Sequence, residues 1–231
     1  MPDVLVLCGG MGTRLRSIVA DKPKALAEIS GRPFLDFLSE ELLSSGMRRQ
    51  VLCVGYRGAQ IAARYKDRLD VDFKISQEDS PLGTGGAVSH AIPHVTSDPF
   101  LVVNGDSYCR VQYAELLAAH EEKHALMSIV VTPVAGRSDV ASVRVGRDGQ
   151  VLNFRERSDQ RTGDESFVNA GIYVMQREAL TFAPSGPAYS LEHDLIPAIV
   201  RTGRCYAYPV SGPLIDIGTP ERYLAAQGGL R

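Results

Sequence analysis

The chain has 231 residues, of which 44% are hydrophobic and 23% charged, a composition typical of a globular protein with a substantial core. Its formal net charge of −2 argues against a non-specific nucleic-acid binder, which presents a strongly basic face. No apolar run approaches the roughly 20 residues that cross a bilayer, and the start of the chain lacks the basic residues of a secretory signal. We therefore expect a cytoplasmic protein that binds neither nucleic acid nor membranes, with four cysteines that are buried thiols.

Short apolar segments alternate with longer amphipathic ones through the first two thirds of the chain. The pattern predicts strands at residues 4–7, 51–54, 72–76, 100–103 and 126–132. It predicts helices from Phe34 to a stop at Gly46, and at residues 59–65, 85–91 and 113–123. This alternation indicates an α/β protein with a Rossmann-like mixed, mostly parallel sheet and helices on both faces. Such sheets bind ligands beyond the carboxyl ends of their strands.

The last third has more strand character. Predicted strands at residues 140–145 and 151–154 flank Asp148-Gly149, a strong hairpin turn signal. A strand at 171–175, a helix at 191–201, a strand at 205–210 and a closing helix at 220–227 follow. We expect one domain over residues 1–231, without internal repeats.

A glycine-rich segment directly follows the first predicted strand: Leu7-Cys8-Gly9-Gly10-Met11-Gly12-Thr13-Arg14-Leu15. Three glycines within four residues let the backbone approach a ligand and turn its N–H groups inward, and Arg14 adds a planar cation suited to phosphate oxygens. The spacing fits neither the dinucleotide fingerprint nor a Walker A loop, which argues against a nicotinamide-dependent oxidoreductase. The plainer interpretation is a tight strand-to-helix turn.

A stiff pair of lysines follows in Asp21-Lys22-Pro23-Lys24. Pro23 fixes its own φ and biases Lys22 towards an extended backbone. A rigidly placed ammonium is useful where phosphate charge shifts during a reaction. The alternative is a pair of solvated surface lysines.

These two segments together resemble the signature of the sugar-1-phosphate nucleotidyltransferases. Five further segments resemble motifs of that family in the same order. Together with the signature they make six matches in order, which is a far stronger signal than any one match. The five segments are Gln77 with Ser80-Pro81-Leu82-Gly83-Thr84-Gly85-Gly86-Ala87, Asn104-Gly105-Asp106, Asn153-Phe154-Arg155-Glu156-Arg157, Val168-Asn169-Ala170-Gly171-Ile172-Tyr173 and Asp216-Ile217-Gly218-Thr219-Pro220-Glu221-Arg222-Tyr223.

The resemblance implies the residues of the site. It implies a nucleotide site made of Leu7, Gly9, Gly10, Gly12, Thr13, Arg14, Lys24, Gln77, Gly83, Thr84, Asn104 and Asp106. Arg14, Lys24 and Asp106 are implied to be catalytic, and Asp106 and Asp216 to hold Mg²⁺. The residues implied to bind the sugar phosphate are Glu156, Arg157, Asn169 and Gly171. In this scheme residues 1–132 form roughly the nucleotide-binding part, and residues 133–231 the sugar-phosphate-binding and closing part.

Each assignment has a plainer alternative. Asp106 follows a predicted strand, where a carboxylate suits Mg²⁺, but Asn-Gly-Asp is also a turn-rich sequence. Asp216 could instead serve the start of the last helix, although Thr219 is the better cap. Glu156 and Arg157 lie among other charges, as in a solvated loop, and Arg157 departs from the lysine usual in the family.

The implied activity transfers a nucleoside monophosphate from a nucleoside triphosphate to a sugar 1-phosphate, with release of pyrophosphate. Within the family the chain most resembles the short enzymes that use GTP and act on heptose or mannose 1-phosphates, with residues 190–197 among the points of resemblance. GTP and D-glycero-α-D-manno-heptose 1-phosphate are the favoured substrates, for surface polysaccharide synthesis. The alternatives are a mannose-1-phosphate guanylyltransferase, or a thymidylyl- or uridylyltransferase for glucose or N-acetylmuramate 1-phosphate. A non-catalytic nucleotide-sugar-binding regulator is the alternative of another class, and a homodimer is left open.

Overall fold

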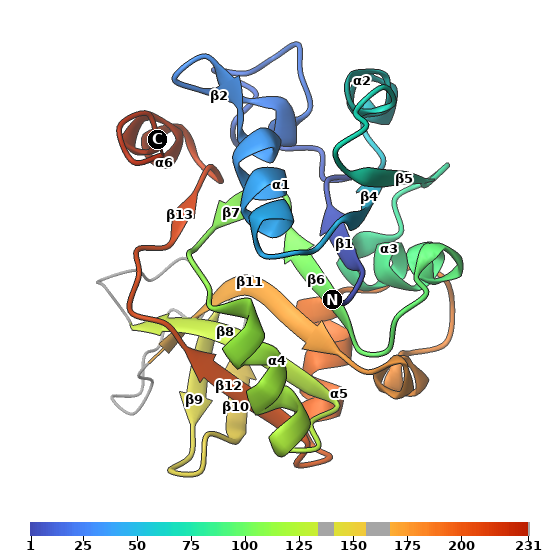
Figure 1. Ribbon diagram of the computed structural model, residues 1–231, viewed down its shortest axis with the longest axis vertical. Coiled ribbons are helices and arrows are strands. Elements are labelled where there is room, and N and C mark those ends of the chain that lie inside the picture. Colours follow the sequence, from blue (N-terminus) through green and yellow to red (C-terminus); the bar gives the residue numbers. More distant parts are fainter. Residues whose placement is uncertain (134–140, 156–166, 231) are drawn as a thin grey trace.

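A mixed sheet of nine strands forms the centre of the computed structural model, which describes residues 1–133, 141–155 and 167–230 (Figure 1). The main strand order is β10-β9-β11-β6-β1-β4-β5, and β8 pairs with β11 and β12. The strands are β1 (Val4–Leu7), β4 (Arg49–Val54), β5 (Asp72–Gln77), β6 (Phe100–Asn104), β8 (Met127–Pro133), β9 (Ser142–Val145), β10 (Val151–Arg155), β11 (Phe167–Met175) and β12 (Cys205–Pro209).

Four neighbouring strands of this sheet, β6, β1, β4 and β5, are parallel, as the alternating pattern predicted. β11 runs antiparallel to β6, β8 and β9, and the hairpin of β9 and β10 turns at Gly149, which has φ +85°. The expected fold class is therefore confirmed. Because the carboxyl ends of parallel strands share one edge, the segments that follow β1, β4, β5 and β6 lie together there.

Helices cover both faces of the sheet and bury its apolar side chains (Figure 1). On one face α1 (Phe34–Ser44), α2 (Gly58–Tyr65) and α4 (Tyr113–Glu122) pack against residues such as Val4, Val6 and Leu52. On the other face α3 (Gly83–Ala91) and α5 (Ile196–Val200) pack against Leu5 and Val51. The four cysteines are buried and unpaired, as expected. Within the described residues no helix is long and apolar enough to cross a membrane.

The helix predicted at residues 191–201 is divided in two. Leu191–Leu195 forms a π-helical turn in which the Ile196 N–H donates to the Leu191 carbonyl, and α5 begins at Ile196. Pro197 stands in the first turn of α5 and has no N–H to give to an upstream carbonyl, which accounts for the break.

Two small two-stranded ladders were not predicted. β2 (Glu28–Ile29) pairs with β3 (Arg32–Pro33), and β7 (Ser107–Tyr108) pairs with β13 (Ile215–Asp216). Strands of two residues are too short to show the alternation by which a strand is recognised in sequence. Their positions depend on tertiary contacts.

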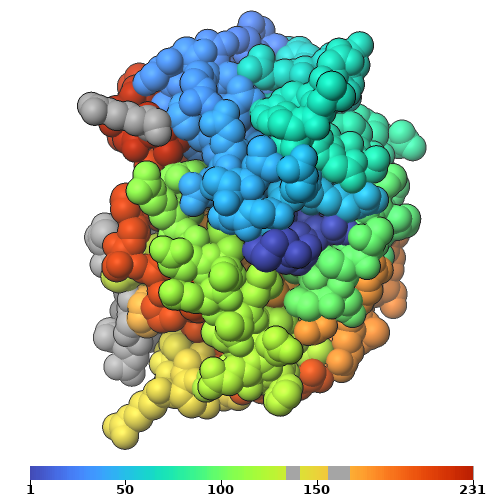
Figure 2. Space-filling model, viewed as in Figure 1, coloured from blue at the N-terminus to red at the C-terminus, as the bar shows by residue number. Residues whose placement is uncertain are grey.

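The C-terminal helix α6 (Pro220–Ala226) packs against the N-terminal third of the chain, where Figure 2 shows red atoms beside blue ones. The Thr219 side chain caps this helix by accepting from the Arg222 N–H, as expected. The Tyr223 hydroxyl donates to the Glu28 carbonyl at 2.7 Å, and Ser30 N–H donates to Gln227 Oε1 at 2.9 Å. These contacts hold the last motif of the chain close to the segment that carries Lys24.

Candidate active site

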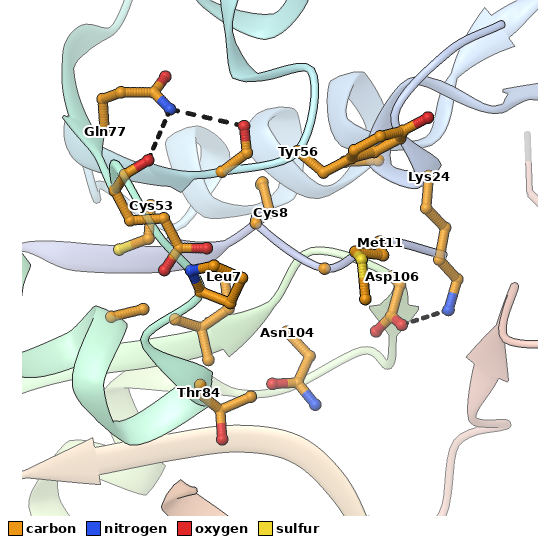
Figure 3. Close-up of a pocket in the computed structure, with 18 of the residues that line it drawn as sticks. Leu7, Cys8, Met11, Lys24, Cys53, Tyr56, Gln77, Thr84, Asn104 and Asp106 are labelled. Carbon is orange, nitrogen blue, oxygen red and sulfur yellow. Dashed lines mark hydrogen bonds and ion pairs between the residues drawn. The ribbon is translucent and has the colours of Figure 1, made fainter. Parts of the chain in front are cut away.

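A cleft of about 720 Å³ lies beyond the carboxyl ends of β1, β4, β5 and β6 (Figure 3). Its walls come from the glycine-rich segment, the lysine segment, the turn after β4, the loop into α3 and the end of β6. The lining residues include nine of the expected nucleotide-binding residues: Leu7, Gly9, Gly10, Lys24, Gln77, Gly83, Thr84, Asn104 and Asp106.

One end of the cleft holds a carboxylate that sequence reasoning missed. Glu78 lies so close to two glycines that a Cβ at Gly55 would stand 2.2 Å from its Oε1 atom, and a Cβ at Gly9 3.0 Å from it. Its Oε2 atom accepts a hydrogen bond from the Leu82 N–H at 3.2 Å. The adjacent Gln77 amide donates to the Glu78 carbonyl at 3.0 Å (Figure 3). The glycines thus leave room for a negative charge inside the cleft.

The start of α3, beside this carboxylate, is fastened to the segment that precedes the π-helical turn. Gly85 and Gly86 N–H groups donate to the Tyr189 carbonyl at 3.0 and 3.1 Å. The Thr84 hydroxyl accepts from the Leu191 N–H at 2.8 Å and donates to Glu192 Oε2 at 2.6 Å. Glu192 therefore supports the cleft wall through Thr84.

Lys24 and Asp106 form an ion pair within the cleft (Figure 3). Pro23 has φ −63° and ψ 147°, and the short helix Lys24–Leu26 follows directly. Burial acts to raise the pKa of Asp106, but the Lys24 ammonium and the Ser107 hydroxyl outweigh it, so this pKa lies below its usual range. Asp106 is therefore ionised throughout the physiological pH range.

Asn104, two residues before Asp106, faces the β11 bulge. Gly171 has φ +75°, and a Cβ there would lie 2.6 Å from Asn104 Nδ2, so only glycine fits. The Asn104 Oδ1 atom is buried without a hydrogen-bond partner in the part of the chain that the structure describes. Asn169 uses its own amide in the bulge, where Nδ2 donates to the Tyr173 hydroxyl at 2.7 Å and Oδ1 accepts from Gly171 N–H at 3.0 Å.

The β7–β13 ladder brings Asp216 next to Asp106, although the two lie far apart in sequence. Asp216 stands opposite Ser107, and the Ile217 N–H donates to the Asp106 carbonyl at 3.0 Å. The Asp216 carboxylate accepts from Arg222 Nη1 at 2.9 Å. A Cβ at Gly218 would lie 2.9 Å from Asp216 Oδ1 and 3.7 Å from Lys24 Nζ, so the lysine and both aspartates share one region.

This donor set fits Mg²⁺. Within the described residues no group of three or more His, Cys, Asp and Glu side chains forms a complete metal cage. Mg²⁺ bound to a phosphorylated substrate needs only one or two protein carboxylates, because phosphate oxygens and water complete its shell. Asp106 and Asp216 supply two such carboxylates. The cleft thiols play no comparable part, since burial raises the pKa of Cys53 to about 12.

Several expected site residues do not line the cleft. Thr13 and Arg14 are exposed and lie outside its lining, while Gly12 has φ +58° and packs on the Lys24 side chain. Glu156 and Arg157 lie outside the described residues. The functions expected of these five residues, and of all the other expected site residues, stay predictions.

The chain matches the nucleotidyl transferase family over residues 3–231 and belongs to that family. The resemblance to nucleotidyltransferases that the sequence motifs indicated is thus confirmed as family membership. The fold and the cleft at the carboxyl ends of the parallel strands agree with this membership.

Three relatives are especially similar. The mannose-1-phosphate guanylyltransferase catalytic subunit beta of Drosophila pseudoobscura pseudoobscura is 34% identical, over 95% of this chain and 60% of its own length. The D-glycero-alpha-D-manno-heptose 1-phosphate guanylyltransferase of Campylobacter jejuni is 30% identical over 96% of both chains. The crystal structure of HddC from Yersinia pseudotuberculosis complexed with GMP-PN has a TM-score of 0.86 and 31% identity, over 99% of both chains. The chain thus spans about 60% of the length of the mannose-1-phosphate relative.

Proposed function

We propose that the chain transfers GMP from GTP to D-glycero-α-D-manno-heptose 1-phosphate. Relatives named as enzymes of this heptose phosphate match over nearly their whole length and nearly all of this chain. Those named as enzymes of mannose 1-phosphate are longer, and the chain spans 60% and 64% of two of them. The full-length agreement favours the heptose substrate and leaves mannose 1-phosphate as the alternative.

The single observation that carries the reaction is the convergence of Lys24, Asp106 and Asp216 at one end of a nucleotide-sized cleft. Two anionic substrates have to meet there. At roughly 4 Å two unit charges repel by about 4 kcal/mol at an effective dielectric of 20. An ammonium group and a metal-binding pair of carboxylates are suited to offset that repulsion.

The chemistry is an in-line displacement. A phosphate oxygen of the sugar 1-phosphate forms a bond to the α-phosphorus, the bond from that phosphorus to the bridging oxygen of the β-phosphate breaks, and its electron pair leaves with pyrophosphate. The attacking oxygen is already anionic, so no proton has to be removed and no general base is needed. Catalysis consists of alignment and charge stabilisation.

The Lys24 ammonium carries three donors, of which Asp106 uses one, so it can also donate to oxygens of the transferring phosphate. The backbone of Gly9 and Gly10 gives that phosphate close approach. Asp106 and Asp216 would hold Mg²⁺, which when bound neutralises charge on the phosphate oxygens.

Glu78 supports guanine as the base. Guanine presents two neighbouring donors, its N1–H and its exocyclic amino group, to an acceptor-only carboxylate. Uracil and thymine present one N–H flanked by two carbonyl oxygens, and a carboxylate is repelled by those carbonyl oxygens. A negative charge held in the cleft by Gly9 and Gly55 therefore favours GTP over UTP and dTTP.

A pyrophosphate-release assay tests the proposal. Purified protein with Mg²⁺ is incubated with each nucleoside triphosphate against a panel of sugar 1-phosphates. Release with GTP and the heptose phosphate is the expected result, and a higher kcat/KM with mannose 1-phosphate would support the alternative. Activity with UTP or dTTP alone would reject the guanylyl assignment, and no release from any pair would leave only a binding function.

A further inference from the structure

Two arginines lie against the ring of Tyr56, at the edge of the cleft. The Arg16 guanidinium carbon is 4.6 Å from the ring centroid and that of Arg57 is 5.3 Å from it, distances typical of cation–π contacts. Arg16 also donates from Nε to the Met11 carbonyl at 3.2 Å, which ties it to the glycine-rich segment. Both Tyr56 and Met11 line the cleft. Two positive charges are therefore held at a wall of the proposed nucleotide site.

These arginines lie on the side of the cleft that carries Lys24. In Figure 3 the ring of Tyr56 lies beside Lys24, with Gln77 at the other side of the view. A second, small cavity of about 10 Å³, space for about one water, is lined by Arg16, Lys24 and Tyr56 among others. The positive charge of Arg16 thus lies near that of Lys24, and Arg57 adds a second positive charge at the same tyrosine ring.

Neither arginine has an acidic partner among the described residues. By contrast, Arg49, Arg64 and Arg204 each form an ion pair with a carboxylate. An arginine that rests on an aromatic face keeps the N–H groups at its edge available, and this planar fork matches the oxygens of a phosphate. The arrangement suits an anion that comes from outside the chain.

The backbone of Arg57 is also unusual. It has φ 54° and ψ 27°, the left-handed conformation that glycine adopts most readily, at the turn from β4 into α2. A residue other than glycine is strained there, and such strain is concentrated at functional sites. At this turn a glycine would relieve the strain but lose the guanidinium.

We propose that Arg16 and Arg57, held on the ring of Tyr56, bind the β- and γ-phosphates of the triphosphate. After the bond to the α-phosphorus has broken, the same two arginines hold the pyrophosphate that forms. This inference rests on the proposed function, because the direction of the triphosphate follows from a base near Glu78 and an α-phosphate near Lys24. The two terminal phosphates then extend from Lys24 towards Tyr56. Two guanidinium groups offset the charge that builds up on the leaving group as its bond to the α-phosphorus breaks.

Calorimetric titration with inorganic pyrophosphate, in the presence of Mg²⁺, tests the inference without a sugar or a base. The double variant Arg16→Gln with Arg57→Gln should bind pyrophosphate at least about tenfold more weakly than the unaltered chain, the scale of one lost charge-assisted contact. Its affinity for GMP, which has no β- or γ-phosphate, should change by less than about twofold. The double variant should also have a raised KM for pyrophosphate in the reverse reaction.

Matched variants separate binding from structure. Arg64→Gln changes an arginine within α2, the helix that Arg57 precedes. Arg64 also lies over a tyrosine ring, 5.9 Å from the centroid of Tyr65, but it is ion-paired with Asp36. This variant should leave pyrophosphate affinity unchanged. Arg57→Gly should weaken pyrophosphate binding while the thermal midpoint stays equal or rises, since glycine relieves the left-handed backbone. Tyr56→Phe should keep the affinity because the ring remains.

Three results would overturn the inference: no measurable pyrophosphate binding by the unaltered chain, unchanged binding by the double variant, or an equal loss of GMP and pyrophosphate affinity. The proposed function fails separately. A chain that binds pyrophosphate through these arginines yet turns over no triphosphate and sugar 1-phosphate pair would refute the transferase activity, whereas normal turnover with arginine-independent pyrophosphate binding would refute only this inference.

Discussion

Asp216 stands opposite Ser107 in a two-residue ladder, and this pairing sets it beside Asp106, which comes from a distant part of the chain. Lys24 closes the arrangement through its ion pair with Asp106. Each of these three side chains belongs to a different segment, and the site exists only when all three segments are folded together. Loss of any one charge should therefore be measurable in catalysis.

Replacing either partner of the ion pair should slow the reaction severely. Lys24→Ala and Asp106→Ala are each expected to lower turnover by at least about a hundredfold, the scale of one lost transition-state contact. Steady-state assays of folded variants measure this, with Lys66→Ala, an exposed lysine at the end of α2, as the control. Near-normal rates for either variant would remove that residue from the mechanism.

Removing the charge of Glu78 should weaken the preference for guanine. Glu78→Gln keeps an oxygen for the Leu82 N–H but loses the negative charge, so the ratio of kcat/KM for GTP to that for UTP should fall about tenfold to a hundredfold. Asp79→Asn removes a charge from the next residue and should keep the ratio. An unchanged ratio in Glu78→Gln would mean that another group selects the base.

A methyl group at Gly55 should displace the Glu78 carboxylate, which packs against that glycine. Gly55→Ala would place a Cβ 2.2 Å from Glu78 Oε1, so Glu78 must move, and both GTP affinity and the thermal midpoint should fall. Gly212→Ala is the control, because a Cβ there meets nothing within 4 Å. Calorimetric GTP titration and thermal unfolding measure the two effects. Equal GTP affinity and an equal thermal midpoint in the two variants would show that Gly55 does not position Glu78.

Acid should destabilise the protein through His120, which is 1% exposed and lies within 2.9 Å of the Ser128 hydroxyl. Burial lowers its pKa to about 4 from an ordinary 6.5. Between these values the unfolded chain binds a proton that the folded chain does not, so the free energy of unfolding should fall as pH falls from about 6.5 towards 4. The slope from this group is about 1.4 kcal/mol per pH unit.

Urea unfolding at several pH values between 7 and 4.5 measures this slope. His120→Gln should reduce it by about one proton. His124→Asn is the matched control, since His124 is exposed and its φ of 47° is a conformation that asparagine tolerates. If the two variants show equal slopes, His120 is not the group responsible.

Much of the fold follows from local patterns in the sequence. β1, β4, β5 and β6 are short runs of β-forming residues whose ends are marked by glycine or polar residues, and α1, α2 and α4 show helical spacing. Once a parallel sheet is inferred, the rule that ligands bind at the carboxyl ends of its strands locates Gly9, Gly10 and Asp106 without a structure. The break before α5 was not predicted, although Pro197, which lacks the N–H that a continuous helix needs, was a signal for it in the sequence.

By itself, then, the sequence determined the elements, the edge of the sheet that binds the ligand, and the motifs that belong to one family, because these depend on neighbouring residues and on a general rule of sheet topology. Only the tertiary structure decided which side chains meet. The pairing of Asp216 with Ser107, the packing of Glu78 against Gly9 and Gly55, and the two arginines on Tyr56 join segments with no local signal for one another. Contacts of this kind are set by the packing of whole elements, and a pattern within a few residues carries no information about them.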